Sequence, residues 1–217
     1  MDPILKKAAL NGDVDKLYQV IGKNPDVLDL IDKIPFVETP LHIAASRGHI
    51  NFAVEILRLK PCFSKKLDVN GLSPMHLALQ KKEISTVLRL LETEDGADLV
   101  RIKGREGVTP LHYVVEVGDL KLLREFLSVS PGSITDKTNR GETALHIAVK
   151  KGNDNALEAL LAFLRRSWYE EALYWEEKVL NWKDEKGYTV LHVAAEMHQL
   201  QVMIMSSLPQ IILSFQL

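Results

Sequence analysis

One short phrase occurs five times in this sequence of 217 residues. It reads Thr or Ser, then Pro, Ala or Val, then Leu or Met, then His, one large apolar residue, and Ala or Val. Its Thr/Ser and His positions are Thr39 and His42, Ser73 and His76, Thr109 and His112, Thr143 and His146, and Thr189 and His192. Successive histidines lie 34, 36, 34 and 46 residues apart, which indicates a tandem array of similar structural units.

The phrase itself predicts the start of a helix. A Thr or Ser hydroxyl can accept a hydrogen bond from an early backbone N–H that has no partner inside the helix. Proline suits the next position because it has no N–H to leave unpaired. We expect each His ring to bond the hydroxyl with one nitrogen and a neighbouring loop carbonyl with the other. The residue before each His should enter the core, at Leu41, Met75, Leu111, Leu145 and Leu191.

Metal binding is the functional alternative for these histidines. Neighbouring helices pack about 8–10 Å apart, whereas zinc needs every nitrogen ligand at about 2.0–2.1 Å. No carboxylate or cysteine recurs at a fixed distance from the histidines to complete a site. We therefore interpret all five as structural and expect no metal, no cofactor and no catalytic residue.

The phrase and its period match the signature of the ankyrin repeat. This resemblance covers nearly the whole chain and implies an all-α solenoid of helix-turn-helix units joined by β-hairpin-like fingers. We place about six repeats in a single domain over 1–217, with Asp2 and Pro3 starting the first helix. The approximate limits are 2–33, 37–68, 71–104, 107–138, 141–183 with an inserted long helix, and 187–217, which is incomplete.

Glycines predict the turns. A glycine six residues after the histidine, as at Gly48, favours a left-handed turn between the two helices of a repeat. Lys82 and His198 stand at this position in two repeats, where we expect a reshaped or strained turn costing about 1 kcal/mol. The finger tips at 68–71, 104–107, 138–141 and 184–187 also end in glycine. The apolar segment Lys33–Glu38 lacks that glycine and is either folded differently or a contact patch.

The insert in the fifth repeat contains all three tryptophans. Residues 155–182 show apolar spacing typical of a helix that continues beyond its usual end. Its aromatics either pack on the adjacent repeats or form an exposed patch for a partner, with Trp168 and Trp175 as the candidate contacts.

Composition narrows the function. The formal net charge of −2 argues against a polyanion-binding surface over the whole chain, so we expect no nucleic-acid partner. No apolar run reaches the length of a membrane span, and Cys62 is the only cysteine. These features favour a cytoplasmic location. The apolar end of the chain, which has no polar capping repeat, marks an interface, a continuation or an aggregation risk.

A narrower resemblance also exists. The segments at 30–44, 71–80, 100–112 and 180–184 are similar to the plant ankyrin-repeat membrane proteins of the bian-da type. This resemblance implies a role in plant immune or defence signalling. Members of that family have transmembrane helices after the ankyrin region, and this sequence has none. It therefore also suggests a truncated regulatory or assembly domain at the cytosolic face of a membrane.

Ankyrin arrays bind protein partners on the surface formed by first helices and finger tips. We call this surface the interaction face. Basic residues predominate there, which favours an acidic segment of a partner protein, although ordinary solvated charges are the alternative. The candidate contacts are Arg47, Asn70, Lys81, Arg105, Glu106, Glu116, Arg140, Lys150, Lys151 and Lys186.

Overall fold

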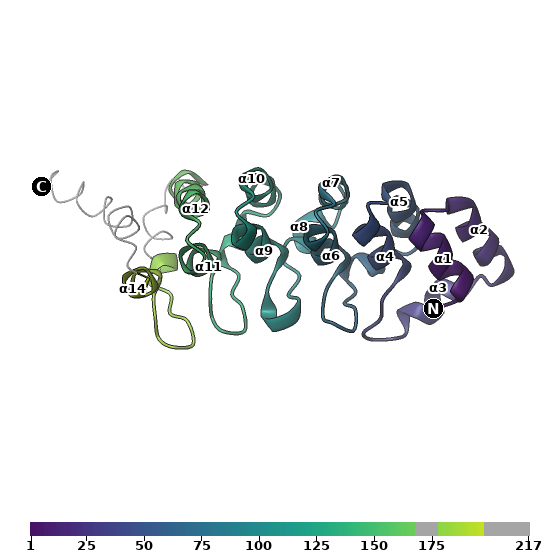
Figure 1. Ribbon diagram of the computed structural model, residues 1–217, viewed down its shortest axis with the longest axis horizontal. Coiled ribbons are helices and arrows are strands. Elements are labelled where there is room, and N and C mark those ends of the chain that lie inside the picture. The colour runs from purple at the N-terminus through teal and green to yellow at the C-terminus, as the bar shows by residue number, and fades with distance from the viewer. Residues whose placement is uncertain (168–177, 198–217) are drawn as a thin grey trace, which may run out of the picture. The chain divides into compact units, whose positions relative to one another are not determined.

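The computed structural model describes residues 1–167 and 178–197. It divides the chain into two compact units, unit 1 from Met1 to Arg105 and unit 2 from Glu106 onward. In the described ranges both units are built from helices, short 3₁₀ turns and finger loops (Figure 1). The expected all-α repeat architecture is therefore confirmed. That all 217 residues share one continuous core remains a prediction.

Unit 1 contains three helix pairs. The pairs are α1 (Pro3–Asn11) with α2 (Val14–Lys23), α4 (Pro40–Arg47) with α5 (Ile50–Leu59), and α6 (Pro74–Gln80) with α7 (Ile84–Leu91). Shorter helices α3 (Val27–Asp32), η1 (Pro61–Lys65) and α8 (Gly96–Leu99) follow the successive pairs. The first helices stack side by side, α1 on α4 and α4 on α6 (Figure 1). Asp2 caps α1 by accepting hydrogen bonds from two backbone N–H groups, as the sequence predicts.

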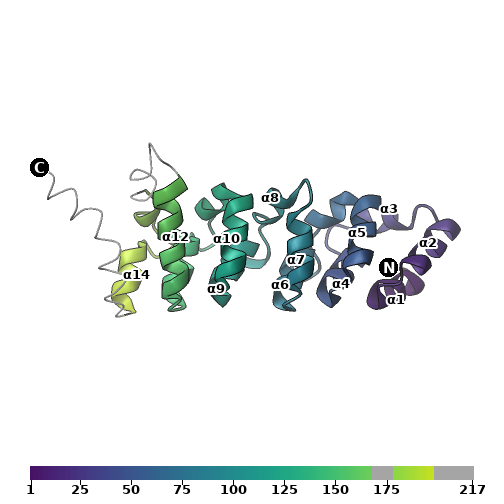
Figure 2. The ribbon, with the colours of Figure 1, turned by 90° about the horizontal axis from the view of Figure 1, so that it is seen from above.

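Unit 2 repeats this plan. Helix α9 (Pro110–Val117) pairs with α10 (Leu120–Val129), and α11 (Ala144–Lys150) pairs with α12 (Asp154–Ser167). Turn η3 (Pro131–Thr135) follows α10, and α14 (Val190–Glu196) stacks on α11 as α11 stacks on α9. Figure 2 shows α10 and α12 side by side along the row of second helices. Turn η2 (Arg105–Gly107) forms the finger tip at the boundary of the units.

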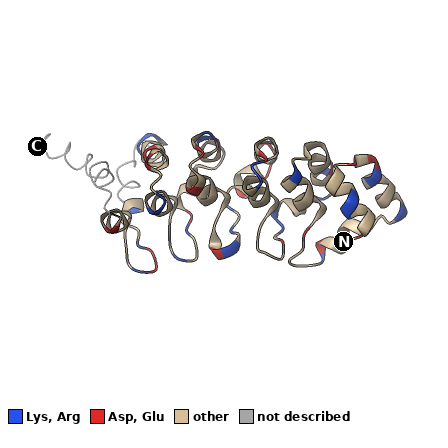
Figure 3. Cartoon of the chain, viewed as in Figure 1, with Lys and Arg blue, Asp and Glu red and all other residues tan. Residues whose placement is uncertain are grey.

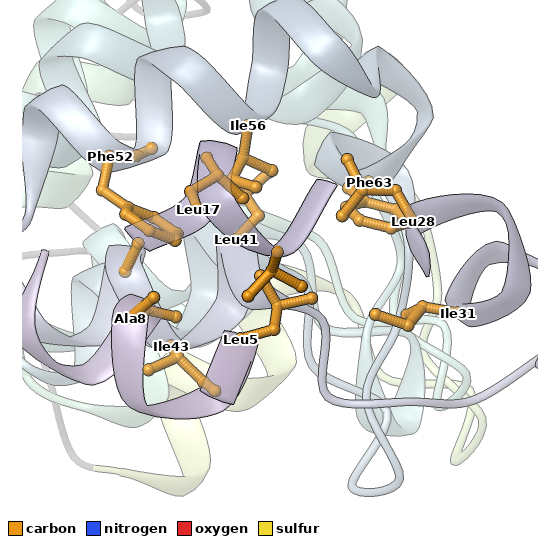
Figure 4. Packing of buried hydrophobic residues seen from close by; sticks show 14 of the residues in the cluster. Leu5, Ala8, Leu17, Leu28, Ile31, Leu41, Ile43, Phe52, Ile56 and Phe63 are labelled. Atoms are coloured by element: carbon orange, nitrogen blue, oxygen red, sulfur yellow. The ribbon is translucent and has the colours of Figure 1, made fainter. Parts of the chain in front are cut away.

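The core of each unit lies between its helix pairs. In unit 1 a cluster including Leu5, Leu17, Leu41, Phe52 and Ile56 joins α1, α2, α4 and α5 (Figure 4). Helical spacing in the sequence predicts that Ala53, Val54, Ile56 and Leu57 face inward on α5. Phe52 is fully buried as well, whereas Val54 and Leu57 are only half-buried. Burial of each large side chain contributes about 1.5–3 kcal/mol, so such clusters supply most of the stability of a pair.

The residue before each motif histidine is buried in four of the five repeats. Leu41, Met75, Leu111 and Leu145 are completely buried, but Leu191 is 37 % exposed. The expectation was wrong for Leu191, which lies on α14, the last helix in the described ranges. The other four lie on α4, α6, α9 and α11, each of which packs against at least two helices of its own unit, whereas the main helix contact of α14 in the described ranges is with α11.

The turns follow their glycines. Gly48, Gly118 and Gly152 have φ between 66° and 79°, and so do the finger-tip glycines at 71, 107, 141 and 187. Lys82 takes the same left-handed conformation with φ of 59°, which confirms the strained turn expected there. His198 lies outside the described residues.

Hydrogen bonds connect successive fingers within each unit. In unit 1 the Arg105 N–H donates to the Gly71 carbonyl at 2.8 Å. In unit 2 the Asn139 N–H donates to the Glu106 carbonyl at 2.9 Å, and the Glu185 N–H donates to the Arg140 carbonyl at 2.8 Å. These bonds hold the tips in register, so each unit presents its finger residues as a row.

The first finger, Lys33–Glu38, has a different structure. It follows α3 and makes a single parallel bridge, Phe36 with Leu67, in which the Val37 N–H donates to the Leu67 carbonyl at 3.1 Å. No residue of this segment has a positive φ. It is folded differently, as its lack of glycine suggested, and Phe36 is nevertheless 60 % exposed.

Candidate interaction face

The recurring histidines form one repeated hydrogen-bond unit. The Nδ1 atoms of His42, His76, His112, His146 and His192 lie 2.7–3.0 Å from the hydroxyl oxygen of the Thr or Ser three residues earlier. All five starts have the capping-box arrangement, in which the ring accepts the backbone N–H of the cap residue. At Thr39, Ser73, Thr109 and Thr189 the hydroxyl also accepts the backbone N–H of the histidine. This confirms the interpretation of the phrase.

The second ring nitrogen reaches the next finger. His42 Nε2 lies 3.0 Å from the Leu72 carbonyl oxygen, and the Nε2 atoms of His112 and His146 lie 3.2 Å from the carbonyls of Asp136 and Tyr188. Each of these histidines therefore connects the start of one repeat to the finger of the next. The His76 ring lies against Gly104 in the third finger.

The backbone fixes the tautomer of these rings. The Thr39 N–H can only donate, and it points to His42 Nδ1 at 3.1 Å, so Nδ1 is an acceptor. The ring proton is then on Nε2 and is donated to Leu72. Burial lowers the pKa of His42 and of His146, because desolvation disfavours the imidazolium form. Neutral rings with both nitrogens occupied are structural groups rather than acid–base catalysts.

Nothing in residues 1–167 and 178–197 suggests a metal centre. No three His, Cys, Asp or Glu side chains in these ranges lie where they could share an ion. In the same ranges, every helix is too short or too polar to cross a lipid bilayer.

The candidate contacts in unit 1 are exposed. Arg47 and Lys81 occupy equivalent positions at the ends of α4 and α6, and Asn70 and Arg105 lie at the second and third finger tips. Helices α4 and α6 pack against each other, and Arg105 is bonded through its backbone to Gly71. The structure thus brings these four residues onto neighbouring repeats of one unit.

The candidate contacts in unit 2 are largely engaged with one another. Lys151 Nζ lies 2.6 Å from a Glu116 carboxylate oxygen, and an Arg140 guanidinium nitrogen lies 3.3 Å from Glu106. Lys150 is half-buried, and its Nζ atom lies 2.5 Å from a Glu142 carboxylate oxygen and 3.5 Å from an Asp184 carboxylate oxygen. Its ammonium group is therefore paired with carboxylates of the finger. These carboxylates raise the pKa of Lys150 against the opposing effect of its desolvation. Lys186 is exposed at the fifth finger tip.

A family model for ankyrin repeats in three copies matches residues 5–103, 95–164 and 111–205. The chain belongs to the ankyrin-repeat family. The matched residues include the capped helices α4, α6 and α9 described above.

Relatives of this ankyrin chain have diverse names. It is 45 % identical over 73 residues to the Arabidopsis thaliana "Ankyrin repeat-containing protein BDA1", which is 34 % of this chain and 17 % of that protein. It is 33 % identical over 127 residues to the Saccharomyces cerevisiae "Probable 26S proteasome regulatory subunit p28", which is 57 % of this chain and 53 % of that one. It is 29 % identical over 109 residues to rice "BTB/POZ domain and ankyrin repeat-containing protein NPR1", covering 48 % of this chain and 19 % of that protein. The chain therefore spans about half the length of these relatives or less.

Solved structures support the fold. A chain in the structure of a predatory endopeptidase with its immunity protein, from Bdellovibrio bacteriovorus, superposes with a TM-score of 0.66. The match covers 90 % of this chain and 92 % of that chain at 23 % identity. At this identity the likeness concerns the fold alone.

Two exposed apolar residues of the ankyrin fingers were not among the candidate contacts named from sequence, although Phe36 lies in the segment Lys33–Glu38, for which a contact patch was one alternative. Val69 is 76 % exposed at the second finger tip, and Phe36 stands beside that finger through its bridge to Leu67. Both are large apolar side chains in loops, which periodicity does not interpret. Exposed fractions of this size were therefore visible only in the structure. The alternative patch at Trp168 and Trp175 lies outside the described residues.

Ion pairs between successive outer loops were also not anticipated. Lys60 Nζ lies 2.6 Å from Asp29 and 3.2 Å from Asp32, and Lys65 Nζ lies 2.8 Å from Asp95 and 2.9 Å from Asp98. The hydrogen bonds to the two aspartates raise the pKa of Lys60. The partners are about one repeat apart in sequence, so these pairs connect the first repeat to the second and the second to the third, on the side of α3 and α8.

Proposed function

We propose that this ankyrin chain is a non-catalytic protein–protein interaction scaffold that binds its partner on the interaction face. The observation that carries the proposal is the contrast between the motif histidines and the face. The histidines are buried and hydrogen-bonded within the fold, whereas the finger tips and first-helix ends present exposed polar and charged side chains. A surface of this kind has groups for recognition and offers no arrangement for chemistry.

The relatives support the same function. Ankyrin repeats occur in proteins whose names concern proteasome regulation as well as in plant proteins such as BDA1 and NPR1. A shared role in partner binding accounts for this diversity better than a shared reaction. For this chain we place the role in plant defence signalling, in the cytoplasm, because of its resemblance to the bian-da type.

The proposal is tested by affinity purification from plant extract with the full chain as bait. A face variant combines Lys81→Glu and Lys151→Glu, one change in each unit. A control combines Lys23→Glu and Lys121→Glu, which are exposed cations on α2 and α10 and give the same change in net charge. Proteins captured by the wild type and the control but lost with the face variant would support the proposal. A capture profile that is unchanged by the face variant would place binding elsewhere.

A second candidate is a regulatory or assembly domain of a longer ankyrin membrane protein. The matched segment is 17 % of BDA1, which favours this reading of the relationship. Sequencing of full-length transcripts from the locus would decide it, because the candidate requires codons for apolar helices downstream in the same frame.

A further inference from the structure

The charges of the interaction face differ between the two units. In unit 2 the candidate cations Arg140, Lys150 and Lys151 all have carboxylate partners within 4 Å, so they contribute little net field at the surface. The pair between Lys151 and Glu116 is half-exposed and the pair between Arg140 and Glu106 slightly more so. A ligand that used these cations would first have to displace the carboxylates.

Unit 1 presents cations without such partners. Arg47, Lys81, Lys103 and Arg105 are exposed, and none makes an ion pair with any residue in the described ranges. Arg47 and Lys81 repeat at the ends of packed helices α4 and α6. Lys103 and Arg105 come from the third finger, where the Arg105 backbone is bonded to Gly71 of the second. Figure 3 shows the basic residues of these finger loops together with the acidic ones.

Nearby carboxylates do not cancel this charge by pairing. Asp68 is buried, and its oxygens accept hydrogen bonds from the backbone N–H groups of Asn70 and Leu72. The Glu83 carboxylate lies against Gly48, where it makes no ion pair with Arg47 in the described structure. Glu38 is paired with Lys6 at 3.4 Å. Among the described residues, the candidate cations without an ion pair are therefore Arg47, Lys81 and Arg105 in unit 1 and only Lys186 in unit 2.

Exposed apolar side chains lie on the first and second fingers, and the second finger is bonded through Gly71 to Arg105 of the third. Val69, at the second finger tip, is 76 % exposed, and Phe36 of the first finger is 60 % exposed. The bridge from Phe36 to Leu67, two residues before Val69, keeps the two fingers adjacent. Two large apolar residues this exposed on consecutive fingers form a surface that a partner can cover with a gain from the hydrophobic effect.

We propose that unit 1 binds a linear segment of a partner protein in which acidic residues alternate with large apolar ones. This inference rests on the proposed function and assigns it a location and a ligand chemistry. The carboxylates of the segment would pair with Arg47, Lys81 and Arg105, while its apolar side chains would cover Val69 and Phe36. Free cations speed encounter with an acidic ligand, and apolar contact then slows its release. A polynucleotide is a less suitable ligand, because the chain carries net negative charge and the fingers expose apolar side chains.

The test uses the full chain and random peptides displayed on phage. Peptides selected on the wild-type chain are sequenced, synthesised with a fluorescent label, and measured by anisotropy against three variants. The first combines Arg47→Glu, Lys81→Glu and Arg105→Glu. The second combines Phe36→Ser and Val69→Ser. The third is a matched control with Lys23→Glu, Lys121→Glu and Arg124→Glu, exposed cations on the second helices. Circular dichroism checks that each variant is folded.

We expect the selected peptides to be rich in Asp or Glu and in Leu, Phe or Trp. The first variant should bind them about tenfold more weakly or worse, the second severalfold more weakly, and the control with wild-type affinity. Raising the salt concentration from about 0.05 M to about 0.5 M should weaken wild-type binding severalfold.

Several outcomes would overturn the inference. Peptides without acidic residues, or peptides whose binding the control variant weakens as much as the first variant does, would rule out an acidic segment bound by Arg47, Lys81 and Arg105 while leaving a scaffold function intact. Displacement of the peptide by a short single-stranded RNA at lower concentration than by unlabelled peptide would favour a nucleic-acid ligand. Failure to select any binding peptide, together with no specific capture from extract, would remove the scaffold proposal as well.

Discussion

Replacing Thr109 measures what the recurring phrase contributes to stability. Thr109 is fully buried, its hydroxyl lies 3.0 Å from His112 Nδ1, and it accepts the His112 backbone N–H at 3.4 Å. That backbone bond is long, so the hydroxyl–imidazole contact should provide most of the effect. Loss of an N-cap typically costs about 1 kcal/mol, and loss of the buried methyl group adds about 0.8 kcal/mol. We therefore expect Thr109→Ala to lower the free energy of unfolding by about 2 kcal/mol.

Two further substitutions separate the hydroxyl from the methyl group. Thr109→Ser keeps the hydroxyl, as Ser73 does in the equivalent place, and should cost less than about 1 kcal/mol. Thr109→Val keeps the shape but leaves the His112 ring and amide without that partner, which should cost about 1–3 kcal/mol. The order of stability should be wild type, serine, and then alanine and valine together.

The assay is urea denaturation followed by far-ultraviolet circular dichroism, with midpoint and slope compared among the variants. An unchanged slope would show that each variant unfolds through the same surface exposure, so that midpoints report stability. If the valine variant is as stable as the wild type, the hydroxyl is not used as a cap. If serine is as damaging as alanine, packing of the methyl group accounts for the phrase instead.

Further predictions follow from single positions. Lys82 has a φ of 59°, so Lys82→Gly should stabilise the chain by about 0.5–1 kcal/mol. Gly118 has a φ of 79°, so Gly118→Ala should destabilise it. Melting temperatures that change in the same direction in both variants would contradict this. Thr86→Val should stabilise by about 1 kcal/mol in urea denaturation, since the buried Thr86 hydroxyl has no hydrogen-bond partner in the described structure, and a loss would reveal a hidden partner. Asn153→Asp should destabilise more than Asn153→Ala, because the Asn153 amide donates to two carbonyls at the end of α9 and a carboxylate would oppose them. The pKa of His42 is lowered in the folded state, so below about pH 6.5 the unfolded chain takes up the proton first and the folded chain should lose stability. An NMR titration that shows the folded ring titrating near pH 6.5 would refute this.

The sequence predicted the fold well because ankyrin repeats encode their local structure in few residues. A cap hydroxyl, a proline and a histidine define the start of a helix, and a glycine defines its end. Helix α4 begins directly after the Thr39 cap and ends directly before Gly48, as this pattern predicts. Local rules sufficed there because each signal acts within one turn of helix.

Prediction was weaker where a side chain depends on a neighbouring repeat. Phe52 was missed as a core residue because it belongs to a cluster with residues of α1, α2 and α4, which periodicity within α5 does not reveal. Leu191 was placed in the core by analogy, yet its exposure is decided by what packs on α14. Burial is a property of the assembled stack, so a pattern within one repeat gives only its local part.

The candidate site shows the same limit for charge. From sequence, Arg47 and Lys151 look alike, since both follow a first helix in equivalent positions of their repeats. In the structure Lys151 has Glu116 at 2.6 Å, one repeat earlier, whereas Arg47 has no ion pair among the described residues. Residues 116 and 151 are 35 positions apart, so the cation and the anion each look like an ordinary surface charge until the repeats are stacked.

Recognition by such an array therefore depends on which charges the stack leaves unpaired rather than on how many it contains. A cation that is already within 3 Å of a carboxylate, as Lys151 is, gains little from a second carboxylate and must give up the first. A cation such as Arg47 or Lys81 gains a partner without losing one. Mutations that remove a carboxylate one repeat away should therefore make a further cation available to an acidic ligand. Glu116→Gln is the simplest example, because it removes the carboxylate that pairs with Lys151 and should let unit 2 itself bind acidic peptides more tightly.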